Sequence, residues 1–142
     1  MKKIIFLSLV IALIIGSCTQ ETRTPIEGAW QMVYATSGEN TFPNDITGSG
    51  IKVWTQDCVA FVGKFQIDTV MLDHFGWGKY RCIEGNKYEE DIVLHNIAPQ
   101  NEGKTVRLLI DIRNDTLIQR YPADENWNLP ENHQTNKYVR VK

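Results

Sequence analysis

Short and long connections alternate strictly between the predicted strands of this chain. From residue 26 onward, segments rich in β-branched and aromatic residues recur, which is typical of strands. Eight such segments are found, at residues 30–34, 51–53, 59–62, 77–83, 88–95, 106–112, 116–121 and 137–141. No amphipathic helix is predicted among them, so the chain is expected to be all-β.

The lengths of the connections predict how the strands are arranged. Tight turns are expected at Gln56-Asp57, Gly85-Asn86 and Asn114-Asp115, the last two being residue pairs that favour hairpins. The long connections are expected at 37–49, 65–75, 96–104 and 122–136. In an antiparallel meander successive turns lie at opposite ends, so every long connection would gather at one end. This pattern predicts a single eight-stranded antiparallel up-and-down barrel over 26–142, with one open mouth.

The N-terminus carries a candidate secretory signal. Lys2 and Lys3 precede an apolar run at 4–15, and Gly16-Ser17 leads directly to Cys18. A positive region, a short apolar core and small residues before a cut are typical of a cleaved signal. The apolar run has 12 residues. A membrane-spanning helix needs about 20, so a permanent helical anchor is not expected.

The residues at this cut resemble the lipobox of bacterial lipoproteins, whose cysteine receives acyl chains such as palmitate. The resemblance implies that residues 1–17 are removed, that Cys18 is lipidated and that 18–25 form a tether. Several acyl chains would hold the protein stably on a membrane. We therefore expect it in the cell envelope of a bacterium. Thr19 is not an acidic retention signal, which favours the outer over the inner membrane, and a soluble secreted protein cut nearby is the alternative.

Two short motifs at the ends of the barrel segment resemble those of one protein family. Gly28-Ala29-Trp30 resembles the Gly-X-Trp signature of lipocalins, and 138–141 resembles their last strand, which carries a basic residue. The closest likeness is to small bacterial lipocalin-like lipoproteins of the calycin superfamily. The resemblance implies that Arg140 lies over Trp30 at the closed floor, where a cation over an indole contributes about 0.5–2 kcal/mol.

A disulfide is expected between Cys58 and Cys82, the two thiols that remain when Cys18 is acylated. A lone pair of cysteines in an oxidising compartment is a candidate bridge. By the chain-entropy relation, closing this loop would stabilise the fold by roughly 3 kcal/mol. Placing the two cysteines opposite each other also fixes a register for their strands, with Phe61 beside Lys79.

This register, with the turn at Gly85-Asn86, predicts which side chains face the interior. It sets Arg81 against Glu90 and brings both inside together with Lys79. Such charges require water or a polar ligand group, because burying them unpaired costs several kcal/mol each. The residues expected to contact a ligand are Tyr34, Phe61, Trp77, Lys79, Arg81, Glu90 and Tyr121. The alternative is that the other face points inward, with Arg81 and Glu90 forming a surface pair worth under about 1 kcal/mol.

Little in the sequence indicates catalysis, a metal, a cofactor or nucleic acid. The histidines at 74, 95 and 133 lack metal-ligand spacing. Basic residues are scattered and the formal net charge is −2, which is not a nucleic-acid footprint. We expect non-enzymatic binding of a small hydrophobic or amphipathic ligand, an anionic one included.

The second functional hypothesis is a barrel filled by its own side chains that binds another envelope protein. Its contacts would come from aromatic residues in or beside the long connections. These residues are Phe42, Phe65, Phe75, Tyr121 and Trp127.

Overall fold

A computed structural model describes residues 24–142 of the chain. The signal at 1–17, Cys18 and most of the tether lie outside this range. The strands are β1 (Gly28–Ser37), β2 (Asn40–Phe42), β3 (Ile46–Trp54), β4 (Cys58–Ile67), β5 (Val70–Glu84), β6 (Lys87–His95), β7 (Thr105–Arg113), β8 (Thr116–Tyr121) and β9 (Gln134–Arg140). One short 3-10 helix, η1 (Pro99–Asn101), precedes β7. No helix within residues 24–142 has the length and hydropathy needed to cross a membrane.

The sheet closes on itself. Strand β1 pairs with β3, each later strand pairs with the next, and β9 returns to pair with β1. Strand β2 pairs only with β1, at the edge of the ring. All pairings are antiparallel. The predicted eight-stranded up-and-down barrel is therefore confirmed, with β2 as an additional short strand.

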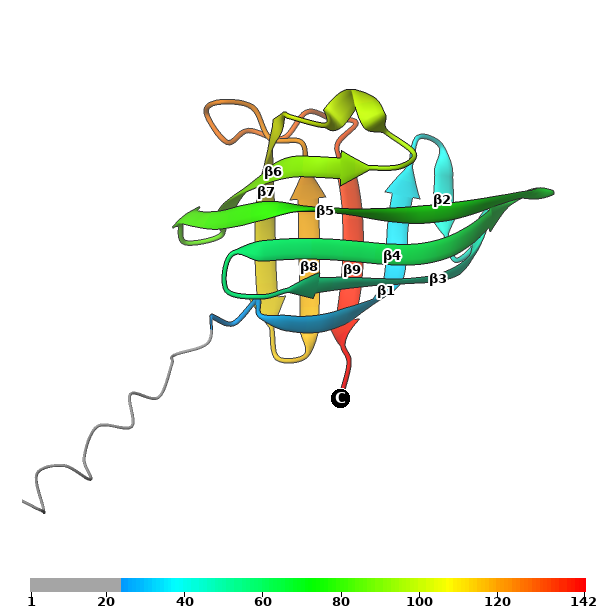
Figure 1. Ribbon diagram of the computed structural model, residues 1–142, viewed down its shortest axis with the longest axis horizontal. Helices are drawn as coiled ribbons and strands as arrows, with labels where there is room; N and C mark the ends of the chain where they lie inside the picture. The colour runs from blue at the N-terminus through cyan, green and yellow to red at the C-terminus, as the bar shows by residue number, and fades with distance from the viewer. Residues whose placement is uncertain (1–23) are drawn as a thin grey trace, which may run out of the picture.

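The two ends of the barrel differ, and two of the predicted long connections lie at the same end. The loop containing η1 and the loop before β9 lie on one side, opposite the β7–β8 turn (Figure 1). Two of the expected tight turns contain a residue with positive φ, Gly85 at 56° and Asn114 at 54°. Glycine and asparagine tolerate this left-handed conformation better than other residues, which explains their place in these turns.

The expected long connection at 65–75 is wrong. Strands β4 and β5 pair without interruption down to Ile67 and Val70, so that only Asp68 and Thr69 form the turn. The alternation of apolar residues continues through this stretch, and Phe65, Ile67 and Leu72 line the barrel interior. A continued alternation favours a longer hairpin over a loop.

The floor of the barrel is built around Trp30, which is fully buried. Its indole Nε1 donates a hydrogen bond of 2.7 Å to the carbonyl of Ile26. The Arg140 guanidinium lies 4.1 Å from the ring centroid and donates to the carbonyls of Glu27 and Pro25. The predicted contact of Arg140 with Trp30 is present.

Gly28 makes this arrangement possible in two ways. Its φ of +128° is one that residues with a side chain rarely adopt. A Cβ at this position would also lie 2.9 Å from a guanidinium nitrogen of Arg140. In the Gly-X-Trp motif, the glycine thus leaves room for the Arg140 guanidinium, and the tryptophan supplies the ring that it contacts.

Bulky side chains fill the lower part of the barrel and leave the upper part partly open. The buried cluster consists of Ile26, Trp30, Trp54, Val59, Tyr80, Tyr88, Leu108, Ile110, Leu117 and Tyr138. Further up, glycines replace side chains on the inner face. The Phe65 ring lies over Gly50 and Gly63, and the Phe61 ring lies over Gly76, each within 2.6 Å of where a Cβ would be. These glycines give the two phenylalanine rings room to lie flat against the inner face of the barrel.

Candidate functional site

The register of β4 and β5 differs from the predicted one. Cys58 pairs with Lys79, and Phe61 pairs with Gly76. The offset is three residues, an odd number, so side chains of β5 expected inside lie outside. The interior placement predicted for Trp77, Lys79 and Arg81 is therefore wrong, and all three side chains are exposed.

The predicted disulfide is wrong for the same reason. Cys58 faces Lys79 on the neighbouring strand, and Cys82 pairs with Tyr88 of β6. Neither thiol forms a disulfide within the part of the chain that the structure describes.

Arg81 belongs to an ion-pair cluster on the outer surface. It contacts Glu89 and Asp91 of β6, and Arg107 of β7 reaches the same Glu89. The alternative prediction, that Arg81 forms an ion pair on the surface, is thus correct. Its partners are Glu89 and Asp91, whereas the prediction named Glu90. A bulge between Trp77 and Gly78 shifts the β5–β6 register by one residue.

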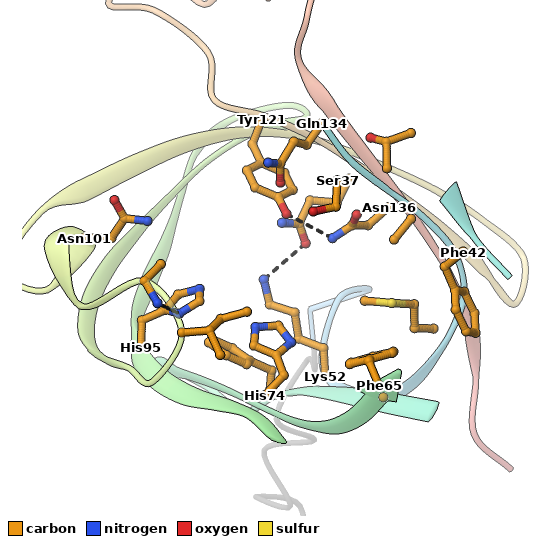
Figure 2. Close-up of a pocket in the computed structure, with 18 of the residues that line it drawn as sticks. Ser37, Phe42, Lys52, Phe65, His74, His95, Asn101, Tyr121, Gln134 and Asn136 are labelled. Atoms are coloured by element: carbon orange, nitrogen blue, oxygen red, sulfur yellow. Dashed lines mark hydrogen bonds between the residues drawn. The ribbon is translucent and has the colours of Figure 1, made fainter. Parts of the chain in front are cut away.

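The interior contains a cavity of about 510 Å³. Of the predicted ligand contacts, Phe61, Glu90 and Tyr121 line it. Tyr34 does not line it, because a bulge between Met32 and Tyr34 interrupts the alternation of β1. Most of the wall is apolar, with Met32, Ile46, Ile51, Phe65, Leu72, Ile92, Val106 and Leu108 among its residues. The cavity extends to the end of the barrel that has the long connections, where it is lined by Ser37, Asn101 and Gln134 (Figure 2).

A buried ion pair lies in the cavity wall, where β3 and β6 face each other across the barrel. The Lys52 ammonium lies 2.7 and 2.9 Å from the two carboxylate oxygens of Glu90 and 3.1 Å from the side-chain oxygen of Gln119. All three residues are at most 5% exposed. Lys52 was not among the predicted site residues. Its place two residues before Trp54, on the same face of one strand, was the only sequence signal for it.

A second polar group lies on β8 and β9. The Asn136 amide nitrogen donates to the hydroxyls of Tyr121 and Tyr138, each at 3.2 Å. Its side-chain oxygen is buried and has no hydrogen-bond partner. Burial raises the pKa of Tyr121 to about 12, and the negative charge of Glu90 acts in the same direction. Burial also raises the pKa of Tyr138. Both phenols therefore stay protonated at neutral pH.

His74 and His95 lie in the cavity wall (Figure 2). They form an aromatic cluster with Phe61. The Phe61 ring centroid lies 4.6 Å from that of His74 and 5.1 Å from that of His95. Burial lowers the pKa of His74 to about 4, helped by the nearby charges of His95 and Lys52. Burial likewise lowers the pKa of His95. Both rings are therefore mainly uncharged at neutral pH.

The aromatic residues predicted for the rim are divided between the interior and the surface. Phe42 is buried edge-on against Phe65, at 5.9 Å between ring centroids. Tyr121 lines the cavity, and Trp127 lies 5.8 Å from the Lys87 ammonium. Of this set, Phe75 is an exposed large side chain on the outer face.

Within residues 24–142, no three histidine, cysteine or acidic side chains are grouped so that they could hold a metal ion. In comparisons with known proteins, the chain matches no protein-family model, and no curated protein is significantly similar to it.

Proposed function

We propose that this protein is a lipid-anchored, lipocalin-like barrel that binds a small hydrophobic or amphipathic molecule without chemical turnover. The observation that carries this proposal is the cavity of about 510 Å³ inside the barrel. Pockets for small molecules commonly have volumes of about 300–1,000 Å³, and their walls are mostly apolar with a few polar groups. A barrel filled by its own side chains would leave no such space.

The residues proposed to contact the ligand follow from the wall of this cavity. Phe61, Glu90 and Tyr121 remain from the sequence prediction, and Lys52, His74 and Asn136 join them. Trp77, Lys79 and Arg81 lie on the outside and are no longer proposed as ligand contacts.

A cavity-filling variant tests this binding site. The mature chain would carry Cys18→Ser, be exported with an ordinary cleaved signal and be titrated with the uncharged fluorophore N-phenyl-1-naphthylamine. Ala35 lines the cavity, so Ala35→Trp should weaken binding at least tenfold. The matched control is Ala60→Trp on the outer face of β4, which should bind as the parent chain does. Unchanged binding by Ala35→Trp would exclude the cavity as the site.

The membrane anchor is proposed from the resemblance of Gly16-Ser17-Cys18 to a lipobox. Expressed in a bacterial host with an alkyne analogue of palmitate, the intact chain should become labelled. Cys18→Ala should abolish the label, whereas Cys58→Ala should keep it. Equal labelling of all three proteins would rule out acylation at Cys18. An anchored protein would lie in the cell envelope, with the outer membrane as the proposed site.

A second candidate function is contact with another envelope protein through the outer face of the sheet. Val62 pairs with Phe75 and Trp77 pairs with Leu94, and all four side chains are exposed. Exposed apolar groups on neighbouring strands mark candidate interaction sites. A photo-crosslinking residue at position 77 should then give a discrete product that Phe75→Ser removes. The same residue at exposed position 113 should give none.

A further inference from the structure

The ammonium of Lys52 has no donor left for a ligand. An ammonium group carries three N–H donors. Lys52 has three acceptors within 3.1 Å, two from Glu90 and one from Gln119. Its charge is also balanced by the carboxylate it contacts. A ligand carboxylate reaching this point would meet Glu90 without gaining a free cation.

No other described residue of the cavity wall offers a positive charge at neutral pH. His74 and His95 are mainly uncharged there, because burial lowers the pKa of both. The side chains of Lys79 and Arg81 lie on the outer face of β5 and do not reach the cavity. An anionic head group would therefore lose its hydration without an ion pair to replace it, which is strongly unfavourable.

Asn136, in contrast, has a hydrogen-bond acceptor that lacks a donor. It is 7% exposed, lies in the cavity wall and directs its amide nitrogen to Tyr121 and Tyr138. Its buried carbonyl oxygen accepts no hydrogen bond. A buried acceptor without a donor is costly, and a ligand that supplies the donor removes this cost.

We propose that the cavity selects an uncharged amphiphile whose hydroxyl group donates a hydrogen bond to Asn136, in preference to a fatty-acid carboxylate. The apolar part of the molecule would lie along Phe65, Ile92 and Val106. This inference rests on the proposed function, because it names the class of ligand for the same cavity.

A head-group series tests the inference on the unaltered cavity. The exported mature chain with Cys18→Ser would be loaded with N-phenyl-1-naphthylamine, which would then be displaced by 1-dodecanol, dodecyl methyl ether or dodecanoate at pH 7.5. The ether keeps an oxygen acceptor but lacks the donor proton. We expect the alcohol to bind at least tenfold more tightly than either of the other two compounds.

Two variants test whether the preference for the alcohol over the ether depends on the Asn136 side chain. Asn136→Ala should reduce the preference for the alcohol over the ether to less than threefold. Asn126→Ala, which alters an exposed asparagine that does not line the cavity, should leave the preference unchanged.

The outcomes separate the two proposals. If dodecanoate binds as tightly as the alcohol, or the ether matches the alcohol, the hydroxyl selection is overturned while the binding cavity stands. If the fluorophore and all three compounds fail to bind, the proposed function fails and the selection fails with it.

Discussion

Lys52 and Glu90 form an ion pair in the barrel interior although 38 residues separate them in the chain, with 2.7 Å between Nζ and Oε1. Their side chains are 7% and 5% exposed. Removing two charges from water costs several kcal/mol per ion, which the contact between them offsets only if both are present. The pair therefore makes the polar part of the cavity sensitive to single substitutions.

Glu90→Gln should destabilise the protein by about 3–5 kcal/mol, because it leaves the Lys52 ammonium buried without a counter-charge. The double variant Lys52→Met/Glu90→Leu should recover most of this loss. Urea unfolding followed by tryptophan fluorescence measures both free energies. A double variant as unstable as Glu90→Gln would contradict this account of the pair.

Arg140→Met should lower the free energy of unfolding by about 1–3 kcal/mol, since it removes a cation over an indole and hydrogen bonds to two carbonyls. Arg113→Met is the matched control, because Arg113 is exposed at the end of β7. Its effect should stay within about 0.5 kcal/mol. Equal effects of the two substitutions would show that the floor does not depend on the contact with Trp30.

Gly28→Ala should destabilise the same floor without removing any contact group. The substitution places a Cβ 2.9 Å from an Arg140 nitrogen, at a φ of +128°. Left-handed backbone of this kind costs a non-glycine residue about 1–3 kcal/mol. Chemical unfolding should give a loss in this range, and the loss should shrink in an Arg140→Met background. If Gly28→Ala cost the same in the parent chain and in Arg140→Met, the loss would come from backbone strain alone and not from the contact with Arg140.

Stability should fall as the pH is lowered from about 6.5 toward 4. The pKa of His74 is about 4 in the folded protein against 6.5 ordinarily. Between these values the unfolded chain binds a proton that the folded protein does not, so protonation favours unfolding by roughly 1–3 kcal/mol. His74→Phe should reduce the difference between urea midpoints at pH 7 and pH 4.5. His133→Gln, outside the cavity, should leave this difference unchanged. If His74→Phe also left it unchanged, the loss of stability at low pH would not come from His74.

Thiol titration of the unfolded, unreduced protein should find Cys58 and Cys82 both reactive. The strand register sets Cys58 beside Lys79 and Cys82 beside Tyr88, so the two are not opposed. Cys58→Ser combined with Cys82→Ser should change the free energy of unfolding by less than about 1 kcal/mol. Loss of a bridge would instead cost about 2–5 kcal/mol. Finding no reactive thiol would show that the pair is oxidised.

The sequence predicted the eight strands of the barrel, the three tight turns and the closure of the barrel, because these follow from local side-chain patterns and connection lengths. It missed β2 and the extension of β4 and β5 into one long hairpin. Alternating side chains indicate strands, and residues such as Gly85 and Asn114 tolerate the backbone of a tight turn. The contact of Arg140 with Trp30 was also predictable, since both motifs lie at the ends of the domain and closure brings them together.

The tertiary structure alone decided which side chains face the cavity. In a strand the side-chain period is two, so an odd change in register moves a whole row from one face to the other. The β4–β5 offset and the bulge after Trp77 put Lys79 and Arg81 outside and left Glu90 inside. The partner of Glu90 comes from β3, a strand that does not pair with β6. Contacts across a barrel depend on its curvature and on the summed registers of all strands between, and no local pattern in a sequence encodes that sum.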